Sequence, residues 1–194
     1  MDTKSLIIDT ATSLFQQKGY KSVGLNEILK ACNVTKGALY HHFPNGKEEL
    51  LITCLQTLNE AITTDIKAIF KEHLSAKETT QSLIDTLIRI LESEGTITGY
   101  TFSSIISEMA TVKEPVRNAC SALYENIQHI YYAKLVTEGF SNETASDIAV
   151  LMTASIEGAM MLCLTQKSTD PLKAIAKLLP DSLEALKKVN KVRL

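Results

Sequence analysis

Apolar residues recur every three or four positions along nearly the whole chain, and this spacing restricts the fold more than any other feature. An α-helix has 3.6 residues per turn, so residues at this spacing lie on one face. The alternation of apolar and polar side chains that is typical of a half-buried strand does not occur at a convincing length. The sequence therefore predicts an all-α protein with about nine helices.

The helix boundaries follow from residues that favour helix ends. Ser141 is a good N-cap, and Asp170 is an N-cap residue followed by Pro171 at the first helical position. Pro180 has no backbone N–H, so we expect it to kink or restart the last helix near Asp181. We expect helices over about 3–18, 25–32, 35–43, 47–72, 77–93, 101–110, 115–138, 141–165 and from 170 onward.

The short helix expected over 35–43 has two different faces. Leu39 and Phe43 point one way, and this apolar face is too small to be stable without a scaffold. Asn33 tolerates positive φ and Thr35 is a good N-cap, so a tight turn is predicted between two short helices. The result is a helix-turn-helix with its second helix exposed. The exposed face carries small, aromatic and cationic residues: Lys36, Gly37, Ala38, Tyr40, His41 and His42.

The residues alone leave a second interpretation of this face open. Tyr40 and His41 also suit packing against a neighbouring helix. The adjacent pair His41 and His42 does not make a metal site, because neighbouring helical side chains point about 100° apart. His73 and His129 are isolated, and we interpret them as ordinary surface or boundary residues.

The first 50 residues resemble the DNA-binding domain of TetR-family transcriptional regulators. The resemblance rests on an ordered set of residues, Gly19-Tyr20, Ile28, Val34-Thr35-Lys36-Gly37-Ala38-Leu39-Tyr40-His41-His42-Phe43 and Lys47-Glu48-Glu49-Leu50-Leu51. Two further runs, 24–29 and 44–50, are similar to the LmrA/YxaF-like branch of that family. The resemblance implies a helix-turn-helix DNA-binding domain over 1–47 and a helical ligand-binding and dimerisation domain over 48–194.

The resemblance also implies how the exposed helix contacts DNA. Thr35 offers its hydroxyl and backbone N–H groups to a phosphate. Lys36 donates to guanine O6 or N7 in the major groove, and Gly37 allows the backbone to approach closely. Ala38 and Tyr40 contact a thymine methyl group, or Tyr40 instead bonds a phosphate.

Four further DNA contacts are implied around this helix. His41 and His42 lie at the edge of the DNA, with His42 on the backbone. Lys47 opens the next helix and binds a phosphate, and Asn26 is an additional base contact. Gly46 departs from the usual family pattern by adding a residue before Lys47, which affects where Lys47 is placed.

The C-terminal part is where the resemblance implies inducer binding and dimerisation. Relatives in the resembling branch respond to flavonoids, so the implied inducer is a small apolar or aromatic molecule of that type. Candidate lining residues are Phe70, Tyr100, Phe102, Met109, Tyr124, Tyr131 and Met152. Two long helices of each subunit are implied to form a four-helix interface, with candidates Ile156, Ala159, Met160, Cys163, Ile175 and Leu179. All of these residues also suit the subunit's own core.

Charge is distributed unevenly along the chain. The whole chain has a net charge of −2, whereas residues 1–47 carry six lysines and three acidic residues, a net charge of +3. A basic N-terminal end indicates nucleic acid as a partner, although chance variation on a solvated surface explains it equally well. The resemblance implies a palindromic or pseudopalindromic operator, bound by a homodimer whose twofold axis matches it.

The four cysteines are widely spaced and carry no CxxC or Cys/His ligand spacing. We interpret them as buried thiols in a reducing cytoplasm, with a redox sensor as the alternative. There is no signal peptide and no run of about 18 apolar residues, so a membrane span is not expected.

Enzymatic activity is not expected either. No nucleophile–base pair, phosphate loop or metal spacing appears, so neither a cofactor nor a metal is expected. Two alternatives to a regulator remain open, a helical small-molecule carrier without DNA binding and an architectural DNA binder. Glu157 lies in an apolar run and either projects to solvent or is a buried carboxylate that needs a partner.

Overall fold

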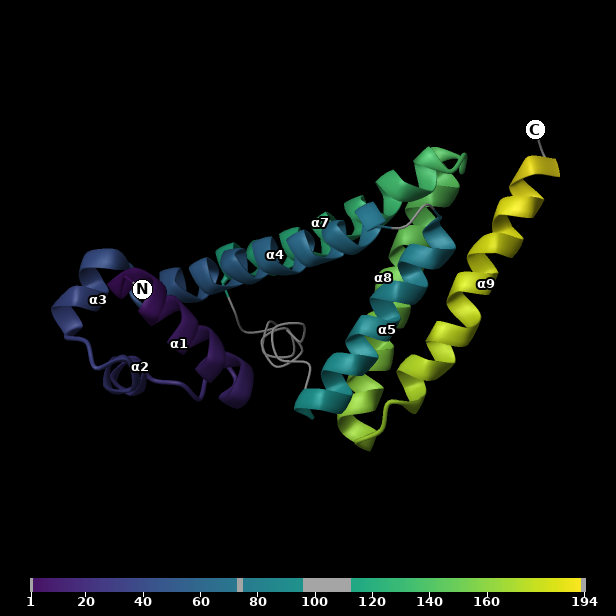
Figure 1. Cartoon of the computed structure of the whole chain (residues 1–194). Helices are drawn as coiled ribbons and strands as arrows, with labels where there is room; N and C mark the ends of the chain where they lie inside the picture. The colour runs from purple at the N-terminus through teal and green to yellow at the C-terminus, as the bar shows by residue number, and fades with distance from the viewer. Residues whose placement is uncertain (1, 73–74, 96–112, 193–194) are drawn as a thin grey trace. The chain divides into compact units, whose positions relative to one another are not determined.

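The structure is a computed structural model and describes residues 2–72, 75–95 and 113–192. The regular secondary structure of these residues is entirely α-helical, which confirms the predicted class (Figure 1). Its eight helices are close to the expected nine, and the helix expected over 101–110 lies outside the described residues. The helices are α1 (Thr3–Lys18), α2 (Leu25–Cys32), α3 (Lys36–His42), α4 (Lys47–Glu72), α5 (Ala76–Glu94), α7 (Glu114–Thr137), α8 (Asn142–Gln166) and α9 (Asp170–Val192).

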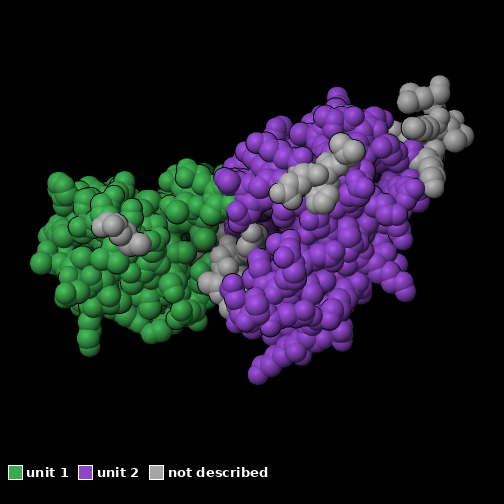
Figure 2. All heavy atoms as spheres, in the orientation of Figure 1, with its two compact units in different colours: residues 1–61, 98–123 green, residues 62–97, 124–194 purple. Residues whose placement is uncertain are grey.

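The described chain divides into two compact units, coloured separately in Figure 2. Unit 1 contains residues 1–61 and 98–123, and unit 2 contains residues 62–97 and 124–194. The division falls inside α4 and inside α7, so each of these helices contributes residues to both units.

Unit 1 places α1 against both α2 and α3. Phe15 and Ile28 are fully buried, as expected for the scaffold of the short third helix, and Leu39 and Phe43 of that helix are buried with them. The beginning of α4 and the first part of α7 complete the core with Leu50, Leu51, Cys54, Leu55, Val116, Cys120 and Leu123. The buried residues of unit 1 therefore include residues from far along the chain.

Unit 2 is organised around α9, which packs against both α5 and α8. Ser75 and Glu78 form a capping box at the beginning of α5, which satisfies N–H groups that a helix start leaves without partners. Leu83 and Leu87 of α5 are buried at the four-residue spacing of one helix face. The pairing of α5 with α9 joins segments that are far apart in the sequence.

Pro180 lies inside α9, which runs without a break from Asp170 to Val192. The helix therefore does not restart near Asp181. The proline removes one helical N–H, yet Leu179 and Leu183 on either side of it are buried, and the Ser182 hydroxyl donates to the Leu178 carbonyl oxygen at 2.8 Å. Tertiary packing of the apolar face keeps the helix continuous where local propensity opposes it.

The helix α8 is long and apolar enough to cross a membrane by length and composition alone. A core helix of a folded domain has the same properties, and α8 buries nine residues from Ala145 to Cys163 inside the chain. We therefore interpret α8 as the core helix of unit 2.

Candidate nucleic-acid interface

The turn between α2 and α3 has the geometry that the sequence predicts. Asn33 ends α2 in the left-handed region, with φ 53° and ψ 42°, and its backbone N–H donates to carbonyl oxygens of the last turn. The Val34 N–H donates to the Leu29 carbonyl oxygen at 3.1 Å, which adds a second backbone donor to a carbonyl at the helix end. Thr35 then caps α3 by accepting a 3.2 Å hydrogen bond from the Ala38 N–H. Because the Thr35 oxygen acts as the acceptor, its O–H hydrogen remains available to a phosphate.

The outward face of α3 is open to solvent. Thr35, Lys36, Gly37 and His41 are exposed, and Tyr40 retains 39% of its side-chain accessibility although it is a large aromatic residue. The other predicted contacts are placed around them: Ala38 and His42 are half-buried, and Asn26 of α2 is exposed. The structure thus brings eight of the nine predicted DNA-contact residues onto or beside one helix-turn-helix surface.

Tyr40 lies between Lys36 and Gly46. The Lys36 Nζ lies 5.8 Å from the centroid of the Tyr40 ring, which is within the range of a cation–π contact. On the other side, a Cβ added to Gly46 would meet the Tyr40 ring at 3.5 Å and the Leu25 side chain at 3.9 Å. Gly46 has φ +70°, so the extra residue forms a left-handed turn directly against the aromatic ring.

Lys47 is the predicted contact whose surroundings differ most from expectation. Its Nζ donates to the Tyr20 carbonyl oxygen and lies 4.1 Å from the centroid of the Tyr20 ring. The side chain is half-buried, and it also lies 5.9 Å from the Phe15 ring centroid. The ammonium group therefore ties the beginning of α4 to the α1–α2 connection. Local sequence patterns do not indicate this contact, because Tyr20 and Lys47 are 27 residues apart.

An ion pair at the beginning of α4 also went unpredicted. Lys113, just before α7, lies with its Nζ 2.9 Å from the Glu48 carboxylate, and both residues belong to unit 1. Glu48 favours the first turn of α4 because its charge complements the helix dipole. Since both side chains are partly exposed, the pair stabilises this junction only modestly.

Four of the seven predicted ligand-lining residues are described, and all four belong to unit 2. Phe70 and Tyr131 stack with ring centroids 5.6 Å apart, and Met152 is buried. Tyr124 is half-buried and donates from its hydroxyl to Glu157 at 3.4 Å. The other three predicted residues, Tyr100, Phe102 and Met109, lie outside the described residues.

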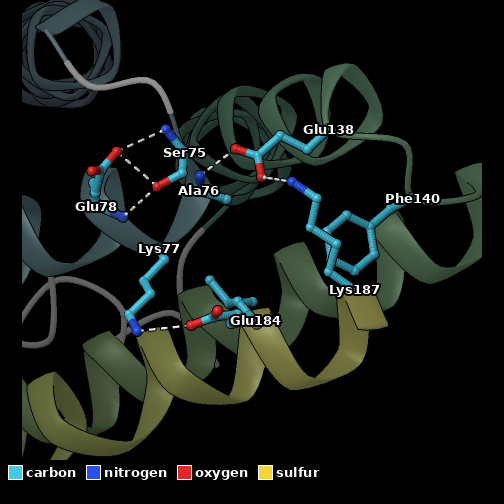
Figure 3. A pocket seen from close by; sticks show the side chains of 9 residues that line it. Ser75, Ala76, Lys77, Glu78, Glu138, Phe140, Glu184 and Lys187 are labelled. Carbon is cyan, nitrogen blue, oxygen red and sulfur yellow. Dashed lines mark hydrogen bonds and ion pairs between the residues drawn. The ribbon is translucent and has the colours of Figure 1, made fainter. Parts of the chain in front are cut away.

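A pocket of about 520 Å³ in unit 2 has a different character from the predicted apolar site (Figure 3). The Glu138 carboxylate accepts from the Ala76 N–H at the beginning of α5 and lies 2.8 Å from the Lys187 Nζ. Lys77 pairs with Glu184 at 2.8 Å across the same pocket. These charges pair with one another, so we interpret this pocket as an ion-pair network that joins α5 and α9 to Glu138, the residue after α7. None of the predicted ligand-lining residues belongs to its lining.

Five of the six predicted dimer residues are buried inside the single chain. Ile156, Ala159, Met160, Cys163 and Leu179 are all at least 94% buried inside the single chain, and Ile175 is half-buried. Side chains in this position fill the subunit core and offer little surface to a partner. The exposed apolar side chains of the same two helices are their neighbours Val150, Leu151, Met161, Leu162, Leu178 and Leu186.

The four cysteines are buried and free of disulfides. Burial raises the pKa of Cys54 to about 12 and that of Cys120 to about 11. Thiols with raised pKa values and little exposure are poor nucleophiles. The structure therefore favours the buried-thiol interpretation over the redox sensor.

The fold and the exposed α3 define a helix-turn-helix transcriptional regulator, and comparison with known proteins assigns its family. Residues 7–54 match bacterial regulatory proteins of the tetR family. Residues 76–178 match the C-terminal domain of LmrA/YxaF-like transcriptional regulators. The chain belongs to the TetR family of transcriptional regulators and carries an LmrA/YxaF-like C-terminal domain, so it belongs to a family of regulators and not of enzymes.

Two relatives from Bacillus subtilis match over nearly their full length. The uncharacterized HTH-type transcriptional regulator YxaF is 35% identical over 92% of this chain and 94% of its own. The HTH-type transcriptional regulator LmrA is 33% identical over 94% of this chain and 97% of its own. The fold matches the crystal structure of a TetR transcriptional regulator from Legionella pneumophila with a TM-score of 0.81, at 23% identity over 94% of this chain and 97% of that one. Members of this family bind DNA and typically act as dimers.

Proposed function

We propose that this chain is a ligand-responsive repressor that binds a palindromic or pseudopalindromic operator as a homodimer in the cytoplasm and is released by a small apolar or aromatic inducer. The observation that carries the proposal is the solvent-exposed α3, held on a buried scaffold by Leu39 and Phe43. A seven-residue helix with this composition has no stability of its own. Its position on α1 and α2 gives its outward face a fixed geometry, which reading base edges requires.

The exposed residues of α3 have the chemistry of major-groove recognition. Lys36 donates hydrogen bonds to guanine, and Gly37 lets the backbone come close. Tyr40 supplies an apolar ring beside a hydroxyl, which suits either a thymine methyl group or a phosphate. Thr35 at the N-cap offers its O–H to a phosphate next to the helix N-terminus. Asn26, Ala38, His41 and His42 complete the proposed contact surface.

We assign the dimer contact to the exposed apolar face of α8 and α9. On α8, Leu151, Gly158 and Leu162 follow one another at seven and four residues, so they share one side of the helix. A Cβ added to Gly158 meets nothing within 4 Å, which leaves room for a partner helix to approach. Leu178 on α9 is 62% exposed. A second copy is the partner that this family supports, and twofold pairing presents two α3 helices to two half-sites.

Inducer response is the third part of the proposal. The aromatic pair of Phe70 and Tyr131 and the polar pair of Tyr124 and Glu157 lie in unit 2, together with Met152. A ligand that binds one conformer of this unit more tightly than the other shifts the equilibrium between the two conformers. The fraction of protein whose α3 helices match the operator then changes. Since α4 and α7 contribute to both units, they are the elements through which we expect the response to pass.

A gel-shift titration against the DNA upstream of the protein's own gene tests the DNA-binding proposal. We expect saturable binding, with random duplex as a poor competitor. Tyr40→Ala should lower the affinity for the operator at least tenfold. Glu60→Gln, an exposed change on α4, is the matched control and should leave the affinity within twofold. Equal affinity for any duplex would identify an architectural DNA binder. If the protein binds no DNA even at low salt, the result supports the alternative of a helical small-molecule carrier.

A further inference from the structure

Gly46 lies in the connection between α3 and α4 and is held there by two backbone hydrogen bonds. Its N–H donates to the Phe43 carbonyl oxygen at 2.8 Å, and its carbonyl oxygen accepts from the Leu50 N–H at 3.0 Å. The first bond closes the turn after α3, and the second begins the hydrogen bonding of α4. Gly46 adopts φ +70° in this turn, a conformation that side chains rarely adopt, with Asn and Asp as the commonest exceptions.

The Tyr40 side chain occupies the space toward which a side chain at position 46 would point. A Cβ added to Gly46 would lie 3.5 Å from the Tyr40 Cε1, 3.7 Å from the Tyr40 hydroxyl oxygen and 3.9 Å from the Leu25 Cδ1. These are ordinary van der Waals distances, so a methyl group fits, whereas a longer side chain meets the ring or the leucine. Gly95 has nearly the same φ, +68°, yet a Cβ added there meets no atom of the described residues within 4 Å. The contact at Gly46 is therefore a local feature and not a general consequence of positive φ.

The Gly46 backbone and the Leu25 side chain limit where the Tyr40 ring can lie. Lys36, four residues earlier on the same outward face of α3, is the neighbour on the other side, with its Nζ 5.8 Å from the ring centroid. A tyrosine on an exposed helix face chooses among several rotamers. Contacts on two sides reduce that choice in the free protein. A side chain that is already in position loses less conformational entropy when it binds a partner.

We propose that Gly46 is a positioning residue for operator binding. Because it has no side chain, it leaves the space that the Tyr40 ring occupies, and so it determines where the ring and its hydroxyl meet the DNA. Gly46 acts through Tyr40 and not by a DNA contact of its own. This inference rests on the proposed DNA-binding function and adds a residue that the proposed contact surface does not include.

Gly46→Asn tests this role without breaking the turn. Asparagine tolerates positive φ, as Asn33 of this chain does at φ 53°, but its amide group extends beyond Cβ toward the ring. We expect the operator affinity to fall about tenfold, because the Tyr40 ring is displaced. The matched control is Gly95→Asn, which makes the same change at φ +68° and should leave the affinity within twofold. Circular dichroism verifies that both variants are folded.

The same substitution in the Tyr40→Ala background shows whether the effect passes through the ring. Without the ring, the longer side chain at position 46 has no aromatic group to displace. At a salt concentration low enough to measure Tyr40→Ala, we expect Gly46→Asn to change its operator affinity less than twofold. Equal losses in the two backgrounds would show that Gly46 acts independently of Tyr40, and this result would overturn the inference.

The position of the ring is measured separately by ¹⁹F NMR of the full-length protein labelled with 3-fluorotyrosine. Tyr40→Phe identifies the Tyr40 resonance among those of the six tyrosines. Without DNA, Gly46→Asn should shift this resonance and Gly95→Asn should not. An unchanged resonance in Gly46→Asn would also overturn the inference.

Operator binding by the wild type distinguishes the two possible failures. If the wild type binds the operator but Gly46→Asn leaves the affinity or the Tyr40 resonance unchanged, only this inference fails. If the wild type binds no operator, the proposed function fails and this inference fails with it.

Discussion

Lys36 and Lys47 lie at the two ends of the DNA-reading segment, and their ammonium groups have different surroundings. The Lys36 side chain is exposed beside the Tyr40 ring, whereas the Lys47 ammonium donates to the Tyr20 carbonyl oxygen within a half-buried site. A charge that is already held by a carbonyl and a ring stabilises the fold, whereas an exposed charge is available to a ligand.

This difference gives a prediction for two matched substitutions. Lys47→Met keeps the apolar stem but removes the ammonium, so we expect the free energy of unfolding to fall by about 1–2 kcal/mol. The slope of log K against log salt for DNA binding should stay unchanged. Lys36→Met should leave stability unchanged and weaken operator binding about tenfold relative to random duplex. A decrease of about one unit in the salt slope with Lys47→Met would show that Lys47 binds a phosphate, as the family resemblance implies.

Glu157 makes stability depend on pH. Burial raises its pKa from the ordinary value of 4.5 to about 7, and the hydrogen bond from Tyr124 opposes the shift. A carboxyl whose pKa is raised on folding contributes stability that is complete below the unfolded pKa and is lost as the pH rises through the folded pKa. The relevant window therefore runs from about pH 4.5 to pH 7.

Glu157→Gln removes this titration. Between pH 5 and pH 8.5, we expect the wild-type protein to lose about 2 kcal/mol more stability than this variant. Urea unfolding at a fixed protein concentration measures the difference, with Asp147→Asn as the control for a carboxylate on the same helix. Parallel pH profiles for the wild type and Glu157→Gln would contradict the assignment.

At the residue scale, the exposed face of α3 and the residues that end and cap the helices were predictable, whereas the contact between Lys47 and Tyr20 was not. Local conformational preferences predict the left-handed conformation of Asn33, the N-cap role of Thr35 and the inward face of α3. The Tyr20–Lys47 contact joins residues that meet only after α1 and α4 come together. Periodicity specifies which residues share a face, but it does not specify which partner reaches that face.

At the element scale, helix boundaries were predicted within about two residues, but the orientation of α8 was not. This helix is apolar on most sides, so its sequence does not distinguish the face toward the core from the face toward a partner subunit. The structure resolves the ambiguity for a single chain, because Met160 and Cys163 are buried while Leu162 is 50% exposed. One residue along an α-helix is a rotation of about 100°, so adjacent residues of α8 face different sides.

The exposed face of α8 and α9 gives the prediction for assembly. Gly158→Leu or Leu178→Glu should convert the proposed dimer to a monomer at micromolar concentration, because a bulky or charged side chain blocks close helix packing. Sedimentation velocity measures the outcome. Lys177→Glu also introduces a glutamate, at the exposed position beside Leu178, and should leave the dimer intact. A dimer that persists in both variants would place the interface elsewhere.

At the scale of the whole molecule, segments that are distant in the sequence belong to one compact unit. Unit 1 extends to residue 61 of α4 and includes the beginning of α7. Val116, Cys120 and Leu123 are buried there. This arrangement was not predictable from local patterns, because it depends on segments that are more than 50 residues apart.

A fragment of residues 1–61 tests the importance of that distant contribution. Without Val116, Cys120 and Leu123 it loses three buried apolar side chains, so we expect it to be roughly 5 kcal/mol less stable than the same unit in the full chain. Thermal unfolding by circular dichroism measures the fragment. Joining residues 113–123 to it by a Gly/Ser linker should restore part of the loss. Unfolding of residues 1–61 at the temperature of the full-length protein would show that the N-terminal domain is complete without α7.

The pairing of α5 with α9 has a consequence for synthesis on the ribosome. The apolar face of α5 is complete once Glu94 has been added, but its cover begins only at Asp170. At translation rates of about 5–20 residues per second, the intervening residues take on the order of 4–15 s. During this interval Leu83 and Leu87 of the nascent chain lack their final neighbours, which makes this helix a ready target for chaperones that bind exposed apolar segments.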